Sequence, residues 1–391
     1  MSKKRIGIVG MALVTLLGAG AAHASPEASR LLSPPMALPV PSGFLSILLL
    51  LTFFVHLVLV NVLLGSVILS AVDRLASASD SKGGMAFMPK VLALAVNFGV
   101  APFLFLQVLY GHFLYPGILL MAVWWMFVAV FAMMAYYGLY VSGEAVGPMR
   151  RKLPLILSAL LLLLTAFLLS NASTLMLRPD FWFRWFSEPH GRLLNTGDPT
   201  LFPRYLHILL ASLAVGGLTM AWRAQWGKRA PESGREETER RFRRGLDWFF
   251  YASLAQVPVG LLFLSALPPD VRSLFLGGDA LSTAALMLVV SGLCIALVLA
   301  RQGRLKLAGA AALGVILVMV CVRGMVRDAM LQPYGGAASP APTALAMPHG
   351  QTSALCLFLA VTALVIAVLV WLGRVLFQAL NRSESSEIRE G

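Results

Sequence analysis

The residues of this sequence best suited to chemistry are histidines inside long apolar segments. His207 lies about one helical turn inside the segment 202–222, FPRYLHILLASLAVGGLTMAW. A spanning helix needs about 20 apolar residues, so this segment is long enough to cross a bilayer. An ionisable side chain within such a helix is costly and marks a functional position by default. Imidazole is a common axial ligand of haem iron, and small residues follow His207, so we predict haem binding there.

Three further side chains are candidate ligands. His56 lies about 13 residues inside the segment 43–71, roughly 20 Å at 1.5 Å per residue. Met287 lies about two turns inside the segment 281–300, and a thioether can occupy the axial position opposite an imidazole. His112, at the end of the segment 91–114, is a weaker metal-ligand candidate. The alternative for His207 is a structural hydrogen bond to a backbone carbonyl or a lipid headgroup.

Two arginines could hold the acidic groups of a cofactor. Arg323 and Arg327 directly follow the segment 305–322. Guanidinium groups suit carboxylates, so the pair could bind haem propionates. Equally, both side chains could reach out to the interface from the helix end.

The elements that must position these residues are nine apolar segments. They lie at residues 43–71, 91–114, 118–140, 153–177, 202–222, 248–267, 281–300, 305–322 and 352–377. Of the 391 residues, 58% are hydrophobic and 13% charged, against about 45–50% and 25% in soluble domains. The predicted fold is therefore all-α, a polytopic membrane bundle of about nine helices over residues 43–377.

The N-terminal residues resemble a cleaved secretory signal. Residues 1–25 have a basic start, an apolar core and an A-x-A-type cleavage site, Ala22-His23-Ala24. Residues 26–42 are rich in proline and serine and are expected to form an exposed leader, and residues 378–391 a cytoplasmic tail. The alternative is an uncleaved anchor, which would add a helix.

The basic loops predict the orientation in the membrane. With the mature N-terminus outside, the loops around residues 74–90, 150–152, 223–244 and 301–306 fall in the cytoplasm, and these carry most of the lysines and arginines. This pattern accounts for most of the net charge of +13, so nucleic acid is not an expected partner. We expect a bacterial cytoplasmic (inner) membrane protein, with a periplasmic N-terminus and a cytoplasmic C-terminus. The haems would then lie toward the periplasmic face.

The cysteines, the acidic residues and the aromatic loop limit the classes of function that the sequence supports. The three cysteines form no CxxC or CxxCH motif, so covalent c-type haem is not expected. The predicted helix interiors hold no aspartate or glutamate, which argues against proton pumps and oxygen reductases, since both relay protons through such groups. The loop after residue 178 contains the aromatic residues Phe181, Trp182, Phe183, Trp185 and Phe186, and we expect an aromatic belt at headgroup level rather than a docking surface.

Five local matches resemble subunit I of the cytochrome bd quinol oxidases. They run in the family's order: HLVLVNVLLG at 56–65, GVAPFLFLQVLYG at 99–111, NASTLMLRP at 171–179, HILLASLAVGGLT at 207–219 and ALMLVVSGL at 285–293. The resemblance implies that His207 and Met287 ligate a low-spin b haem and that His56, at the position of another haem ligand of the family, remains as a further haem ligand. It also implies non-covalent haem b, one or two per chain.

The sequence lacks three features that serve oxygen reduction and quinol binding in that family. The segment 118–140 lacks the family's glutamates, the connection 268–279 is too short for its quinol loop, and the segment with Arg323 lacks its glutamate ligand. The chain therefore resembles a short, divergent relative. It is expected to exchange electrons between the quinone pool, directly or through other membrane subunits, and a periplasmic c-type cytochrome.

Three alternatives stay open. The chain could be a quinol:oxygen oxidoreductase with rearranged ligands, or a haem-free transporter or scaffold. The outer histidines could also bind copper, although no HxH or HxxxH spacing supports such a site.

Overall fold

The protein is described here by a computed structural model. It describes residues 42–76, 87–144, 148–226 and 235–336, the isolated residues Leu32 and Leu38, and scattered residues between 356 and 374. The predicted signal peptide lies outside the described residues, as do nearly all of the leader and most of the ninth segment. The chain divides into two units, one of which contains residues Gly43–Ala338. In the other unit, the described residues from Cys356 to Arg374 are helical and exposed.

The described part of the chain is helical and contains no strand. Eight helices are long and apolar enough to cross a membrane, which confirms the all-α membrane fold. They are α3 (Ser42–Ala76), α4 (Met88–Leu120), α5 (Ala122–Glu144), α6 (Pro148–Leu177), α7 (Leu201–Trp226), α8 (Arg235–Ala266), α10 (Ala280–Arg301) and α11 (Leu305–Leu331).

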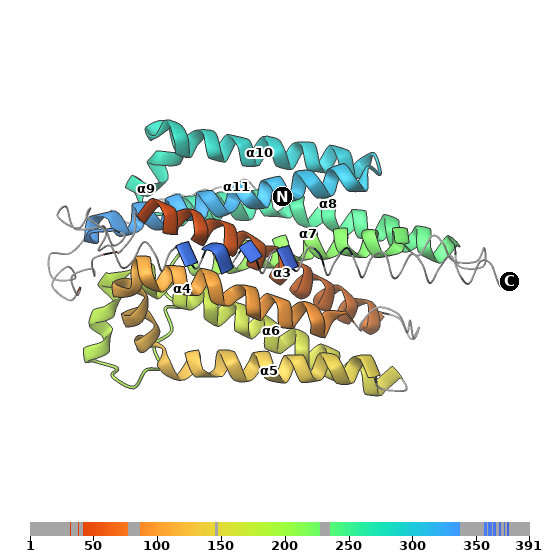
Figure 1. The fold of residues 1–391 in the computed structure, drawn as a ribbon, viewed down its shortest axis with the longest axis horizontal. Coiled ribbons are helices and arrows are strands. Elements are labelled where there is room, and N and C mark those ends of the chain that lie inside the picture. Colours follow the sequence, from red (N-terminus) through yellow and green to blue (C-terminus); the bar gives the residue numbers. More distant parts are fainter. Residues whose placement is uncertain are drawn as a thin grey trace, which may run out of the picture. The chain divides into compact units, whose positions relative to one another are not determined.

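Shorter elements join these helices at one end of the first unit (Figure 1). They are η1 (Pro179–Phe186), α9 (Pro269–Ser273), η4 (Leu274–Gly278) and η5 (Gln332–Tyr334). We call this the α9 end. It is the end at which the sequence places the periplasm.

The central helix α7 packs tightly against two others because glycines line its contacts. A Cβ atom on Gly65 of α3 would collide with the backbone carbonyl of Ser212, and one on Gly217 would lie 2.6 Å from the carbonyl oxygen of Gly245 in α8. Small residues allow helix backbones to approach closely where lipid supplies little hydrophobic driving force. The Ser212 hydroxyl also donates to Asn61 Oδ1 at 2.8 Å, which ties α3 to α7 within the bundle.

Several helices extend beyond the apolar segments. The segment 305–322 predicted a helix that ends before Arg323, but α11 continues to Leu331 and so includes Arg323, Arg327 and Asp328. The prediction stopped at the first charged residues, and helical hydrogen bonding continues past them. α8 likewise begins at Arg235 rather than near Trp248.

α4 departs from the prediction at its C-terminal end. The sequence predicted a break near Pro116, yet helix continues to Leu120 and the turn falls at Met121. The irregular residue is instead Tyr110, at φ −132° and ψ 23°, where α4 is kinked. Pro116 lies inside α4 six residues after Tyr110, and an internal proline removes a helical hydrogen bond and kinks the helix on its N-terminal side.

The aromatic segment after α6 forms η1 and is only partly exposed. Trp182 is 4% exposed, and its indole N–H donates to the carbonyl oxygen of Leu175 at 2.9 Å. Phe186 is 73% exposed. The expectation of a belt was therefore wrong for Trp182, which anchors the loop, because its indole reaches a carbonyl in the last turn of α6.

Candidate functional site

His56 lies between α3 and α4 with a defined ring orientation. Its Nδ1 is 2.9 Å from the carbonyl oxygen of Ala95. A carbonyl oxygen only accepts, so Nδ1 carries the hydrogen and Nε2 keeps its lone pair. Histidines that ligate metals are held in this way, by a backbone carbonyl that fixes the tautomer.

The space for the His56 ring is provided by Gly99 of α4. A Cβ atom at Gly99 would lie 2.8 Å from Cε1 and 2.9 Å from Nδ1 of that ring. Both distances are shorter than real Cβ contacts, so glycine is required here for packing. Phe53, one helical turn before His56, has its ring centroid 6.2 Å from the imidazole centroid.

His207 lies on α7 and faces α8. A Cβ atom at Gly260 would lie 3.7 Å from Cε1 and 3.8 Å from Nδ1 of His207, which is ordinary contact. Its Nδ1 is buried and meets no hydrogen-bond partner among the residues that the structure describes. Leaving a buried polar atom unpaired costs about 1–3 kcal/mol, which a ligand bound at Nδ1 itself would offset.

These two environments fit the prediction that imidazoles hold a cofactor. His56 offers an oriented ring with an available Nε2, and His207 offers a buried nitrogen without a partner. The rings come from α3 and α7, and the close contact of these helices at Gly65 and Ser212 follows both histidines along their helices. Neutral imidazoles of this kind suit haem iron, which either ring would hold through a nitrogen.

The structure places the other candidate ligands less favourably. Met287 on α10 is 55% exposed. Helix α10 packs against α11 and α8, whereas His207 lies on α7. The pairing of Met287 with His207 therefore stays a prediction. His112 has its Nε2 3.2 Å from the carbonyl oxygen of Gly336. Across the described ranges, no three side chains of the metal-binding types gather in one place.

Arg323 and Arg327 point toward other helices of the bundle. The guanidinium carbon of Arg323 lies 4.5 Å from the centroid of the Phe53 ring, and that of Arg327 lies 4.2 Å from the centroid of the Tyr110 ring. Arg323 also donates to the Ser173 hydroxyl at 3.4 Å. Arg323 therefore lies near His56, beside Phe53, whereas Arg327 lies against Tyr110 at the kink of α4.

One carboxylate close to Arg327 was missed by the sequence. Asp328 Oδ1 accepts from Tyr110 Oη at 2.5 Å and from Arg327 Nε at 3.0 Å. The residue was missed because α11 was predicted to end before it. The hydrogen bond from Tyr110 to Asp328 connects the kink of α4 to α11.

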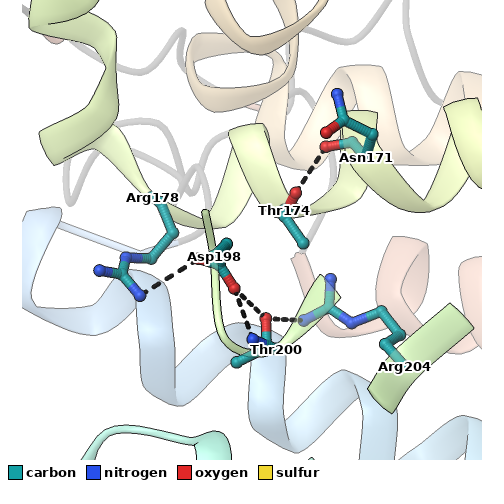
Figure 2. Close-up of polar contacts among 6 residues, drawn as sticks. All are labelled: Asn171, Thr174, Arg178, Asp198, Thr200 and Arg204. Carbon is teal, nitrogen blue, oxygen red and sulfur yellow. Dashed lines mark hydrogen bonds and ion pairs between the residues drawn. The ribbon is translucent and has the colours of Figure 1, made fainter. Parts of the chain in front are cut away.

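A second polar network lies in the loop between α6 and α7 (Figure 2). The Asp198 carboxylate accepts from Arg178 at 3.2 Å and from the Thr200 amide at 2.8 Å. Figure 2 shows Arg204 approaching Thr200 from the side opposite to Arg178, with its Nη2 3.5 Å from the Thr200 hydroxyl. Spacing along the sequence did not reveal this network, because it depends on how the loop folds over the end of α7.

Comparison with known proteins gives a structural likeness. No protein-family model matches this chain, and no curated protein matches it. Five chains of solved structures match. One is a chain of the bd oxidase from Geobacillus thermodenitrificans, with a TM-score of 0.60 and 15% sequence identity over 85% of this chain and 97% of that chain. The likeness confirms the fold that the sequence resemblance implied.

Proposed function

We propose that this chain is a membrane subunit that binds b-type haem and transfers single electrons in a respiratory complex. It would exchange electrons between the quinone pool and a periplasmic c-type cytochrome. The observation that carries the proposal is the unpartnered, buried Nδ1 of His207 on a spanning helix. The oriented imidazole of His56, with its Nε2 available, supports it.

The residues would have distinct roles in such a subunit. His207 and His56 would hold haem iron through their imidazoles, and Met287 is the predicted second ligand of the haem that His207 binds. Arg323 and Arg327 would bind propionates. The haem would supply the reversible one-electron chemistry, and the surrounding helices would orient it and exclude water.

The test is a reduced-minus-oxidised spectrum with a pyridine haemochrome assay on the detergent-purified protein. A b-type signal is expected, and His207→Ala should remove a sharp reduced α-band while the protein still inserts. His56→Ala should remove a different signal. Absence of haem after expression in a haem-replete host would contradict the proposal, and an unchanged spectrum in His207→Ala would contradict the ligand assignment.

A second candidate function is quinol:oxygen oxidoreduction, which the structural likeness to a bd oxidase favours. The missing glutamates of the segment 118–140 and the short connection between α8 and α10 argue against it. Oxygen uptake by the purified protein with a quinol donor would distinguish the two. Sustained uptake that His56→Ala abolishes would favour the oxidase.

A further inference from the structure

Two arginines from different helices meet at one hydroxyl near the α9 end. Arg204 Nη1 on α7 lies 3.3 Å from Ser173 Oγ, and Arg323 Nη2 on α11 lies 3.4 Å from the same oxygen. Arg327 follows one turn after Arg323 on α11. Arg204 and Arg327 are both close enough to Arg323 to repel its charge. We call Arg204, Arg323 and Arg327 the arginine cluster.

The nearby carboxylates pair with only one member of this cluster, Arg327. Asp328 forms an ion pair with Arg327, and Asp198 forms one with Arg178. Asp198 attracts Arg204 only from a distance. Within the described ranges, neither Arg204 nor Arg323 forms an ion pair, and their other polar partners are the hydroxyls of Ser173 and Thr200.

This arrangement is costly without a further anion. Like charges repel, and the repulsion is stronger beside helices in a low-dielectric region than in water. Charged groups within spanning segments are normally paired with one another or with backbone carbonyls. Each guanidinium has five donors, so most of the N–H groups of Arg204 and Arg323 remain available.

The side chains are held in place instead of reaching out to the interface. Arg323 stacks on Phe53 of α3, and Arg204 lies 5.4 Å from the centroid of the Phe263 ring of α8. Arg323 is nevertheless accessible from outside the protein. The guanidinium groups of the cluster are therefore held in place by neighbouring side chains, and that of Arg323 can be reached by an anion from outside.

We infer that the arginine cluster, with the Ser173 hydroxyl, binds a ligand through its carboxylate or phosphate groups. Guanidinium groups bind both through paired N–H donors. The ligand has two possible sources, the propionates of a haem held by His207 or His56 and the phosphate of an anionic lipid. Arg204 precedes His207 by one turn, which places the cluster beside the proposed haem ligands. The inference rests on the proposed function only for the first source.

The test uses Arg204→Gln and Arg323→Gln in the full-length protein, with Arg184→Gln as the matched control. Arg184 lies in η1, and its guanidinium stacks on Phe181 at 4.9 Å. Haem content is measured by pyridine haemochrome. Lipid binding is measured by native mass spectrometry, with phosphatidylglycerol and phosphatidylcholine added separately to the detergent-purified protein. Each cluster variant should weaken binding of the anion about tenfold or more, the loss expected for a hydrogen bond between charged groups.

The outcomes separate the two sources. Loss of haem with unchanged lipid binding identifies the propionates, and loss of phosphatidylglycerol with unchanged haem identifies lipid phosphate. A wild-type protein without haem would contradict the proposed function, while the lipid titration would still test the cluster. Haem and phosphatidylglycerol binding equal to wild type in both variants would overturn the inference, as would a wild type that lacks haem and does not prefer phosphatidylglycerol.

Thermal unfolding distinguishes a role of Arg323 in anion binding from a role in folding alone. In protein stripped of haem and lipid, Arg323→Gln should melt no lower than wild type, because it removes a charge that its neighbours repel. Arg323→Lys keeps the charge but not the paired donors, so it should fold and bind the anion with intermediate affinity. A lower melting temperature of stripped Arg323→Gln, with anion binding unchanged, would assign the arginine to folding and overturn the inference.

Discussion

Gly99→Ala tests whether the orientation of the His56 ring matters for stability and for the proposed haem signal. The new methyl group would lie 2.8 Å from Cε1 and 2.9 Å from Nδ1 of His56. These atoms belong to a rigid ring whose Nδ1 is bonded to the carbonyl oxygen of Ala95. The ring must therefore turn away, and its hydrogen bond is lost or stretched.

The magnitude follows from two opposing effects. Overpacking of a buried site costs about 1–3 kcal/mol, and the lost hydrogen bond about 0.5–1.5 kcal/mol. Replacing glycine by alanine within a helix gains about 1 kcal/mol. We expect a net loss of about 0.5–3.5 kcal/mol in the free energy of unfolding, together with loss or shift of the spectral signal that depends on His56.

Gly260→Ala is the matched control for this change. It gains the same helix propensity, but its Cβ would lie 3.7 Å from Cε1 of His207, in ordinary contact. It should therefore be neutral or slightly stabilising and should keep the His207 signal. The assays are thermal unfolding in detergent and a reduced-minus-oxidised spectrum. If Gly99→Ala melts as high as Gly260→Ala and keeps both signals, the reasoning about the His56 ring is refuted.

Three further outcomes test other parts of the site. Met287→Leu should shift the reduced α-band that His207→Ala removes if the thioether is the second ligand; an unchanged band would exclude Met287. Tyr110→Phe should lower the free energy of unfolding by about 1–3 kcal/mol, since its hydroxyl bonds the Asp328 carboxylate; an unchanged melting temperature would show that the bond contributes nothing. The amide of Ser282 donates to the Asp279 carboxylate at 2.7 Å and lowers its pKa, so this cap should stabilise α10 above about pH 4 and be lost as the pH falls through the lowered pKa. Protection against hydrogen exchange at the start of α10, measured relative to the intrinsic rate at each pH, should then fall in acid in the wild type and not in Asp279→Ala.

The sequence alone determined the class of fold and the helices on which the candidate ligands lie. Spanning helices need long apolar segments, and those segments are visible without any tertiary contact. His56 and His207 could be singled out for the same reason, since ionisable residues stand out in apolar surroundings.

Only the tertiary structure decided which of these residues meet. The tautomer of His56 depends on Ala95, and the space for its ring depends on Gly99, both on another helix. The convergence of Arg204 and Arg323 on Ser173 joins three helices that are distant in sequence. Apolar periodicity is too weak in all-round hydrophobic helices to show which face meets which neighbour, because lipid and protein interior favour the same side chains. Close packing at glycines sets those faces, and it appears only when the helices are assembled.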